Sequence, residues 1–202
     1  SLIVRTRHKV SQSQVRESSF LVLFPAYSED KVIVRSVENF LLQSYSSERY
    51  HVAVISDHQK PVTNQLLSQL PISLLQPSFD HSSKAKALQY AIANMARDYD
   101  YVVILDADNI VNADFLRAVN NEMFRGHKVL QCHRCAKNSD SSISMLDGVS
   151  EEINNTIFRR AHNAIGLSSA LIGSGMCFDY QWFASHVNKL STAGEDRELE
   201  AM

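Results

Sequence analysis

The chain has 202 residues, of which 45% are hydrophobic, and this is enough for one sizeable core but too little to indicate two domains. Its 20 Lys and Arg residues nearly balance 22 Asp and Glu, so the overall charge gives no reason to expect a nucleic-acid partner. Three cysteines in a chain of this length argue against a disulfide framework and for a reducing compartment, which makes the cytoplasm the expected location.

The first residues, 1–17, are polar and basic and show no sustained hydrophobic period, which is typical of a tail or linker. No apolar run approaches the roughly 20 residues that cross a bilayer. The basic tail would suit a segment beside the cytosolic face of a membrane, where Lys and Arg accumulate. Because the chain starts at Ser1 and stops inside a charged stretch, we expect a fragment of a longer protein.

From residue 20 onward, short apolar runs alternate with amphipathic stretches. In chain order the pattern predicts strand 20–24, helix 31–43, strand 51–56, helix 61–70, strand 72–76, helix 82–96, strand 101–105, helix 113–124 and strand 128–133. The strands are apolar without clean alternation, and most are followed by a helix. This predicts an α/β domain with a mostly parallel sheet that is covered by helices on both faces.

The last part of the chain continues the alternation. Apolar residues three or four apart predict a longer helix over 144–165. A strand within 170–178 is interrupted by Gly173 and Gly175, and Asp179 is placed to cap a short helix.

Acidic residues follow three of the predicted strands. Residues 26–30, Asp57, and the pair Asp106 and Asp108 all stand where a strand ends. In open α/β sheets the ligand crevice lies beyond the carboxyl ends of the strands, so we expect these acids to converge on one edge.

Asp106 and Asp108 have two interpretations. Carboxylates held about 4 Å apart repel each other by about 1 kcal/mol in water, and a divalent cation removes this repulsion. Mg²⁺ or Mn²⁺ held by one or two carboxylates typically completes its shell with substrate phosphates, which indicates a diphosphate ligand. The alternative is a simple turn, because Asp and Asn bond their own backbone, and for an isolated pair of this spacing the turn is favoured.

Six motifs change this balance: "FPAYSED" (24–30), "ISD" (55–57), "SSKAKAL" (82–88), "LDAD" (105–108), "GSG" (173–175) and "GEDRELE" (194–200). Their order and spacing resemble those of the inverting family-2 glycosyltransferases of the GT-A fold. The resemblance covers about residues 20–200 and implies a GT-A domain over 18–202 that is truncated at its C-terminus. Ser28 stands where the family has Asn, and Ser83 where it has Gly.

The resemblance implies a donor site and a metal site. The implied donor-nucleotide residues are Pro25, Ala26, Tyr27, Glu29, Asp57, Lys84 and Asp106. Asp108 would bind Mg²⁺ or Mn²⁺. Taken alone, Asp57 could equally cap its strand, and Lys84 would more simply be a solvated lysine.

By the same resemblance, Asp196 is the general base that takes the proton from the acceptor hydroxyl. The implied acceptor region contains Gly173, Ser174, Gly175 and Glu195. The alternative for Asp196 is an acidic first turn favoured by the helix dipole. Trp182 could stack on a sugar ring, although a core position is favoured.

The implied function is metal-dependent transfer of a sugar from a nucleotide-sugar, with UDP as the expected nucleotide, to a hydroxyl of a sugar or lipid-linked acceptor, with inversion. Polysaccharide or glycan synthesis by a membrane-anchored full-length protein is a further hypothesis. A nucleotidyltransferase is an alternative, but the glycine-rich basic loop expected after its first strand is absent. A noncatalytic nucleotide-binding module also stays open. "CHRC" at 132–135 lacks a second cysteine pair, so no zinc site is expected.

Overall fold

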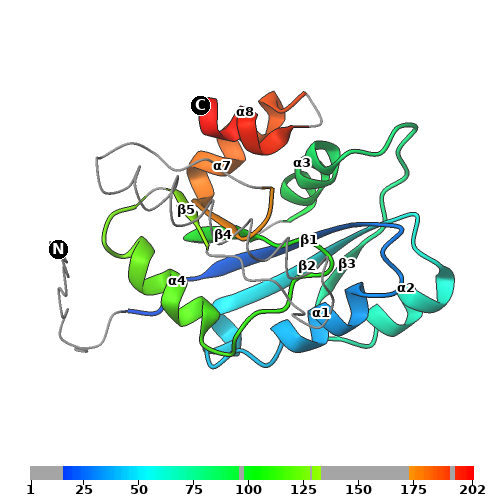
Figure 1. Cartoon of the computed structure of the whole chain (residues 1–202), viewed down its shortest axis with the longest axis horizontal. Helices are drawn as coiled ribbons and strands as arrows, with labels where there is room; N and C mark the ends of the chain where they lie inside the picture. Colours follow the sequence, from blue (N-terminus) through cyan, green and yellow to red (C-terminus); the bar gives the residue numbers. More distant parts are fainter. Residues whose placement is uncertain (1–15, 96–97, 128, 133–172, 192–193) are drawn as a thin grey trace, which may run out of the picture.

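The computed structural model describes residues 16–95, 98–127, 129–132, 173–191 and 194–202. In this part of the chain six strands form one sheet in the order β3-β2-β1-β4-β6-β5 (Figure 1). The strands are β1 (Phe20–Tyr27), β2 (Tyr50–Asp57), β3 (Ser73–Leu75), β4 (Tyr101–Ile104), β5 (Val129–Gln131) and β6 (Met176–Asp179).

Four neighbouring strands of the sheet are parallel, and one strand is reversed. β1 pairs in parallel with β2 and with β4, and β2 pairs in parallel with β3. β6 runs antiparallel to both β4 and β5. The mostly parallel sheet predicted from the sequence is therefore confirmed, while the reversal of β6 was not predicted. Because of this reversal, the segment that precedes β6 meets the carboxyl end of β4.

Helices cover both faces of the sheet. The helices are α1 (Ile33–Phe40), α2 (Pro61–Leu67), α3 (Lys84–Asn94), α4 (Phe115–Met123), α7 (Tyr180–His186) and α8 (Glu195–Ala201), with short 3₁₀ turns at Ser47–Arg49 and Val187–Lys189. Figure 1 shows α1, α2 and α4 on one side of the sheet and α3, α7 and α8 on the other.

The two faces are built from alternate residues of the same strands. In β1, Leu21 and Leu23 contribute to the core under α3, whereas Phe20, Val22 and Phe24 contribute to the core under α1. All five side chains are completely buried. Burying one such side chain stabilises the fold by about 1.5–3 kcal/mol, so a central strand buried on both faces is apolar throughout.

The helix predicted over 31–43 ends at Phe40, which is earlier than expected. The reason lies in Gln43, whose side chain serves a different helix. Its Oε1 accepts a hydrogen bond from Leu116 N at 2.9 Å, and its Nε2 donates to Asn112 O at 2.7 Å. These bonds satisfy the start of α4 and hold residue 43 outside α1. The helix predicted over 144–165 and residues 1–15 of the predicted tail lie outside the described residues.

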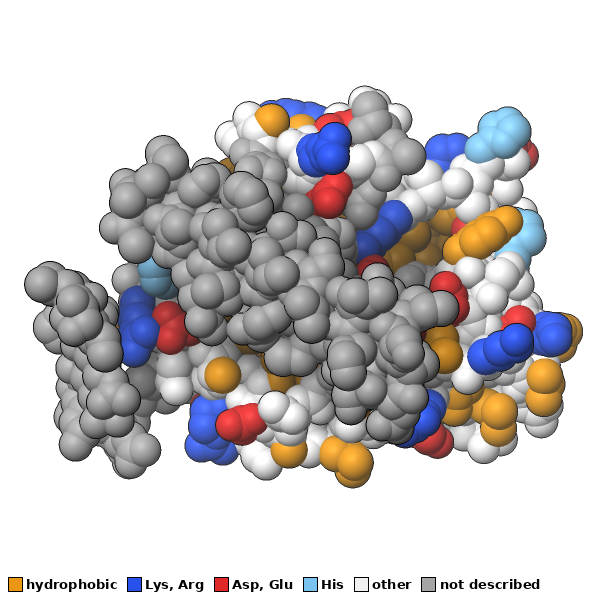
Figure 2. All heavy atoms as spheres, viewed as in Figure 1, with side chains coloured by type: hydrophobic (Ala, Val, Ile, Leu, Met, Phe, Trp, Pro, Cys, Tyr) orange, Lys and Arg blue, Asp and Glu red, His pale blue; other side chains and the backbone are white. Residues whose placement is uncertain are grey.

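The surface agrees with the balanced composition. Figure 2 shows Lys and Arg side chains interspersed with Asp and Glu over the described surface of one face. Among the described residues, no helix combines the length and the apolar character that a membrane span requires.

Candidate functional site

The carboxyl ends of β1, β2 and β4 lie at one edge of the sheet, here called the carboxyl edge. Tyr27 and Asp57 are register partners at the ends of β1 and β2. Gly175, just before β6, donates its N–H to Ile104 O at the end of β4, at 2.9 Å. The loop after β4, which carries Asp106 and Asp108, therefore lies beside the segment that leads into β6.

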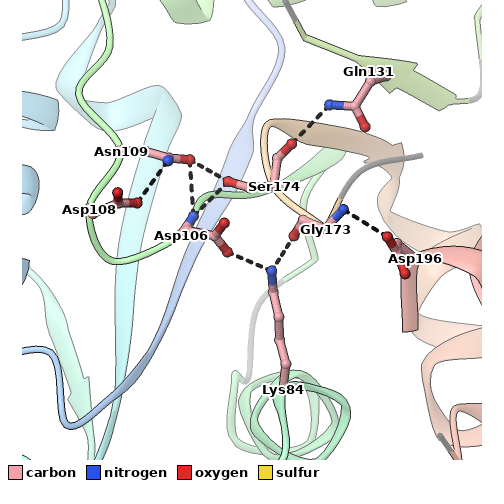
Figure 3. A network of polar contacts seen from close by, with 8 residues as sticks. All are labelled: Lys84, Asp106, Asp108, Asn109, Gln131, Gly173, Ser174 and Asp196. Atoms are coloured by element: carbon pink, nitrogen blue, oxygen red, sulfur yellow. Dashed lines mark hydrogen bonds and ion pairs between the residues drawn. The ribbon is translucent and has the colours of Figure 1, made fainter. Parts of the chain in front are cut away.

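The loop after β4 is a turn, and it is also the centre of a polar network. Asn109 N donates to Asp106 O at 3.0 Å, which closes the turn. The Asp106 N–H points back at Asn109 Oδ1 (3.1 Å) and at Ser174 Oγ (2.8 Å). Ser174 Oγ in turn donates to Asn109 Oδ1 (Figure 3). The turn interpretation is thus correct but incomplete, because the turn is tied to a segment 65 residues away.

Lys84, the first residue of α3, reaches into this network. Its Nζ donates to Asp106 Oδ1 at 2.6 Å and to Gly173 O. The side chains of Lys84 and Asp106 are 21% and 37% exposed, so this ion pair is partly shielded from water. The interpretation of Lys84 as a solvated surface lysine is wrong for this structure. It fits Lys86 instead, whose side chain is exposed and whose Nζ donates to His81 O at 2.7 Å.

The backbone at Gly173–Gly175 is bent in a way that favours glycine. Gly173 has a φ of 31° and Gly175 a φ of 68°, values that side chains with a Cβ rarely adopt. Between them Ser174 is completely buried, and its carbonyl accepts from Gln131 Nε2 at 2.9 Å. The bend aims the Gly173 carbonyl at Lys84 and the Gly173 N–H at Asp196 (Figure 3).

Asp196 lies at one end of the network and Asp108 at the other, with Asp106 between them (Figure 3). Asp196 Oδ2 accepts from Gly173 N at 3.2 Å, and its Oδ1 accepts from Arg197 N at 2.9 Å. Asp108 is exposed, and its Oδ1 accepts from Asn109 Nδ2 at 3.2 Å. Asp196 is held in the first turn of α8, as the helix-dipole interpretation expects, but a second segment also holds it. The side chain of Glu195 lies outside the described residues.

The other predicted donor residues form a separate group at the ends of β1 and β2. Asp57 is buried and accepts from His58 Nδ1 at 2.6 Å, while its carbonyl accepts from Ser28 N at 3.0 Å. Tyr27 is exposed, and its ring lies 5.3 Å from that of His58. Among the described residues, no hydrogen bond joins this group to the Lys84–Asp106 network. The structure therefore brings the predicted residues to one edge, in two clusters.

Three predicted donor residues make contacts that mainly support the fold. Pro25 and Ala26 are part of β1, and Ala26 is buried in the core under α1. The Glu29 side chain is exposed, and its carbonyl accepts from the N–H groups of Val32 and Ile33 at the start of α1. These contacts shape the loop after β1.

Sequence reasoning missed three residues of the site: His58, Asn109 and Gln131. Asn109 stands in the "DADN" motif, where it was considered only as a turn former. His58 directly follows Asp57, but whether two neighbouring side chains touch depends on the backbone angle φ between them. No pattern in the sequence reveals that angle. Gln131 belongs to a short edge strand and reaches the site only because β6 is reversed.

Residues at this edge suit a cation that the substrate helps to hold. Within the described residues there is no group of three or more His, Cys, Asp or Glu side chains that could hold a metal ion on its own. Asp106 and Asp108 are two carboxylates on one turn, and an ion such as Mg²⁺ can be bound by one or two carboxylates together with phosphate oxygens and water. Burial raises the pKa of the Cys132 thiol to about 12, and Cys135 lies outside the described residues.

Trp182 takes the core position rather than a sugar-binding one. Its ring stacks between Phe178 and His186, with centroid distances of 5.8 Å and 4.6 Å. It lies in α7, which begins directly after β6 at the edge opposite the carboxyl edge.

The family model described as "Glycosyltransferase like family 2" matches residues 18–200. The chain belongs to this family, as the motifs predicted. No curated protein matches the sequence closely enough to count as a relative.

Solved structures of other glycosyltransferases share the fold. TarS from S. aureus (residues 1–349) superposes with a TM-score of 0.62 at 16% identity, over 89% of this chain and 53% of that one. The mannosyltransferase PcManGT from Pyrobaculum calidifontis, in complex with GDP-Man and Mn²⁺, gives 0.60 at 19% identity, over 84% and 47%. Glucosyl-3-phosphoglycerate synthase from Mycobacterium tuberculosis, with Mn²⁺, UDP and glucosyl-3-phosphoglycerate, gives 0.53 at 14% identity, over 81% and 57%. The predicted GT-A fold is confirmed, and the chain spans about half the length of these structures.

Proposed function

We propose that the chain is the donor-binding and catalytic part of a hexosyltransferase that moves a sugar from a UDP-sugar to a hydroxyl group, with inversion and with the help of Mg²⁺ or Mn²⁺. One observation carries the proposal: Lys84 and Gly173 connect Asp106 of the turn after β4 to Asp196 of α8. A donor carboxylate and a candidate base from segments 90 residues apart in sequence are thereby held at one edge of the sheet, where α/β proteins bind ligands.

The donor is assigned to the side of the network formed by the turn after β4. Asp106 would contact the nucleotide, and its orientation is fixed by Lys84, whose charge also offsets the repulsion between Asp106 and the donor phosphates. Asp57 and Tyr27, at the neighbouring strand ends, would contact the base. Support for a nucleotide-sugar comes from the structural neighbours, which include TarS in complex with UDP-GlcNAc.

Asp108 is the residue proposed to hold the cation. Its side chain is exposed on the turn, where donor phosphates could complete the shell of the ion. When bound, the ion would supply positive charge that stabilises the departing UDP. Two of the structural neighbours contain Mn²⁺, which supports this assignment.

Asp196 is proposed as the general base. The N–H groups of Gly173 and Arg197 each hold one of its carboxylate oxygens, and this fixes the direction in which the remaining lone pairs point. A hydroxyl placed beside Gly173 and Ser174 could pass its proton to this carboxylate while its oxygen attacks the anomeric carbon. Attack from the face opposite the departing UDP inverts that carbon.

A binding and transfer series tests the proposed function. Nucleotide-sugars are titrated into the protein by calorimetry with Mn²⁺, with Mg²⁺ and with EDTA, and UDP release from the best donor is then followed with sugar and lipid-linked acceptors. We expect metal-dependent binding of a UDP-sugar, and product NMR should show the inverted anomer. A retained anomer, or UDP release that EDTA leaves unchanged, would overturn the mechanism; binding without any transfer by the full-length protein would favour a noncatalytic module.

The location of the full-length protein is a separate part of the proposal. The basic residues of the predicted tail would place it on the cytosolic face of a membrane, where polysaccharide or glycan synthesis can use lipid-linked acceptors. Fractionation of cells that express the full-length protein tests this. Recovery in the membrane fraction until detergent is added is the expected result, and complete recovery in the soluble fraction would refute it.

A further inference from the structure

Ser28 and His58, in the loops after β1 and β2, have backbone conformations that cost free energy. Their φ angles are 52° and 58°, and they are the two non-glycine residues with positive φ in the described part of the chain. A left-handed backbone costs an ordinary residue about 1–2 kcal/mol, and such strain is concentrated at functional sites. Asn is one of the few non-glycine residues that tolerate this conformation, which is a physical reason why Asn is the usual residue at the position of Ser28 in the family pattern.

The left-handed backbone of His58 turns its side chain back onto Asp57. A carboxylate can only accept, so His58 Nδ1–H donates to Asp57 Oδ1, at 2.6 Å. The Asp57 side chain is only 5% exposed, so this bond fixes its carboxylate. Its other oxygen, Oδ2, has no hydrogen-bond partner among the described residues, although it is not one of their fully buried unpaired atoms. One carboxylate oxygen is therefore held in place for a donor from outside the protein.

Two aromatic rings lie at the ends of the same two strands, on Tyr27, the register partner of Asp57, and on His58. The centroids of the Tyr27 and His58 rings are 5.3 Å apart, and the ring planes make an angle of 55°. Tyr27 is 58% exposed, and the His58 side chain is 56% exposed. Exposed rings next to a fixed acceptor suit a flat ligand that stacks and donates an N–H in its own plane.

The two loops are bound to each other. Asp30 Oδ1 accepts from Thr63 Oγ1 at 2.6 Å and from Lys60 N at 2.8 Å, and these hydrogen bonds lower the pKa of Asp30 below its ordinary value. Ser28 Oγ also donates to His58 O at 3.4 Å. The rings and the carboxylate are therefore presented by one joined structure rather than by two independent loops.

Gln59, the next residue, also has a conformation that lowers stability. Its side-chain nitrogen and oxygen are the atoms that are buried without a hydrogen-bond partner in the described part of the chain. An unpaired buried polar group costs about 1–3 kcal/mol. Strain at residue 58 and unpaired atoms at residue 59 together indicate that this loop is shaped for a ligand.

We propose that His58 determines which donor base is accepted: it holds Asp57 Oδ2 ready for a ring N–H and, with Tyr27, supplies the surface on which the base stacks. This inference rests on the proposed function. Uracil and guanine carry a ring N–H that can donate to a carboxylate. Cytosine and adenine carry a lone pair at the corresponding ring nitrogen, which the carboxylate repels. His58 is thus a positioning residue for Asp57 and a contact residue for the base.

Calorimetric titration of UDP, GDP, CDP and ADP at one fixed Mn²⁺ concentration tests the inference. The wild-type protein should bind UDP or GDP at least about tenfold more tightly than CDP and ADP, because a site built around a hydrogen bond rejects a ligand that lacks it. His58→Gly keeps the left-handed backbone without strain but removes the ring and the bond to Asp57. In this variant the preferred nucleotide should weaken about tenfold or more, since stacking alone is worth about 1–3 kcal/mol per base.

Selectivity separates this role from a structural one. In His58→Gly the ratio of UDP to CDP affinity (or of GDP to ADP) should move toward one. His127→Gly, at an exposed histidine after α4, is the matched control and should bind like wild type. Unchanged binding and selectivity in His58→Gly, or an equal weakening of all four nucleotides, would overturn the inference alone. Failure of the wild type to bind any of the four would overturn the proposed function as well.

Discussion

Aspartates gather at both edges of the sheet, but they make different contacts at each. At the amino edge, Asp98, Asp100 and Asp179 line a recess of about 350 Å³. Asp100 accepts from Ser19 N at 2.7 Å and from Ser19 Oγ at 2.9 Å, and Asp179 caps α7 through Trp182 N at 2.9 Å. These acids begin or end an element, which is a structural use of a carboxylate.

At the carboxyl edge two of the acids are linked to each other through a lysine and a bent segment. Lys84 reaches Asp106 from α3, and Gly173 reaches Asp196 from the segment before β6. The acids of the recess at the amino edge have no ionic partner of this kind among the described residues. A recess lined by acids is therefore weak evidence for a functional site. The residues that bind each carboxylate are the better guide to whether it belongs to a candidate site or only ends a strand.

Of all substitutions at the two edges, Asp196→Asn is expected to lower the rate of sugar transfer most. Loss of a general base typically lowers the rate by about 10²- to 10⁴-fold, so UDP release in the presence of acceptor should fall by this factor. Donor binding should persist, because Asp196 lies at the end of the network opposite Asp108. Steady-state kinetics and calorimetry measure the two effects separately.

Asp179→Asn is the matched control for Asp196→Asn, since Asp179 also stands at the start of a helix. It should cost less than about 0.5 kcal/mol of stability, because Asn caps a helix about as well as Asp, and it should leave transfer unchanged. If both variants lost activity equally, the functional distinction between the edges would be wrong.

A smaller loss is expected for Asp108→Asn. It removes a proposed cation ligand and should weaken Mn²⁺-dependent UDP binding by about tenfold or more, while binding in EDTA stays the same. Asp114→Asn serves as control, because Asp114 is exposed, is close in sequence and makes no side-chain capping bond. Equal affinities in the two variants would remove Asp108 from the donor site.

Lys84→Gln should change stability more than Lys86→Gln. It leaves Asp106 partly buried without its cation, which should lower the free energy of unfolding by about 1–2 kcal/mol. Lys86 is exposed, and its replacement should cost less than about 0.5 kcal/mol. Urea denaturation compares the two variants. A Lys84 variant as stable as the Lys86 variant would show that the network contributes no stability.

The smallest effect is expected at the amino edge, for Asp100→Asn. The amide still offers an oxygen to Ser19, so the loss of stability should stay below about 1 kcal/mol. UDP affinity should be that of the wild type, because the carboxyl edge is untouched. A clear loss of UDP affinity would instead point to the acidic recess as a ligand site.

Much of the fold can be predicted from local sequence, because apolar runs such as 20–24 and 101–105 are buried on both faces and show it in composition. The acids at strand ends could be placed at one edge by the rule for parallel sheets. Motif order added Lys84 and Asp196, which composition alone would leave on the surface.

The remaining features depend on tertiary structure and leave no local signal. The reversal of β6 is set by its pairing with β4 and β5, and it alone brings Gln131 and Ser174 to the site. His58 reaches Asp57 only through a left-handed backbone, which few non-glycine residues adopt and which no local sequence pattern signals here.

Paramagnetic broadening by Mn²⁺ tests the central claim most directly. With UDP present, substoichiometric Mn²⁺ should broaden the backbone amide signals of residues 105–109 and 173–175 first in a ¹H–¹⁵N spectrum. Signals of residues 98–100 and 179–181, at the amino edge, should stay sharp. Broadening centred on the amino edge, or uniform weak broadening that UDP does not change, would contradict the assignment of the donor and its cation to the carboxyl edge.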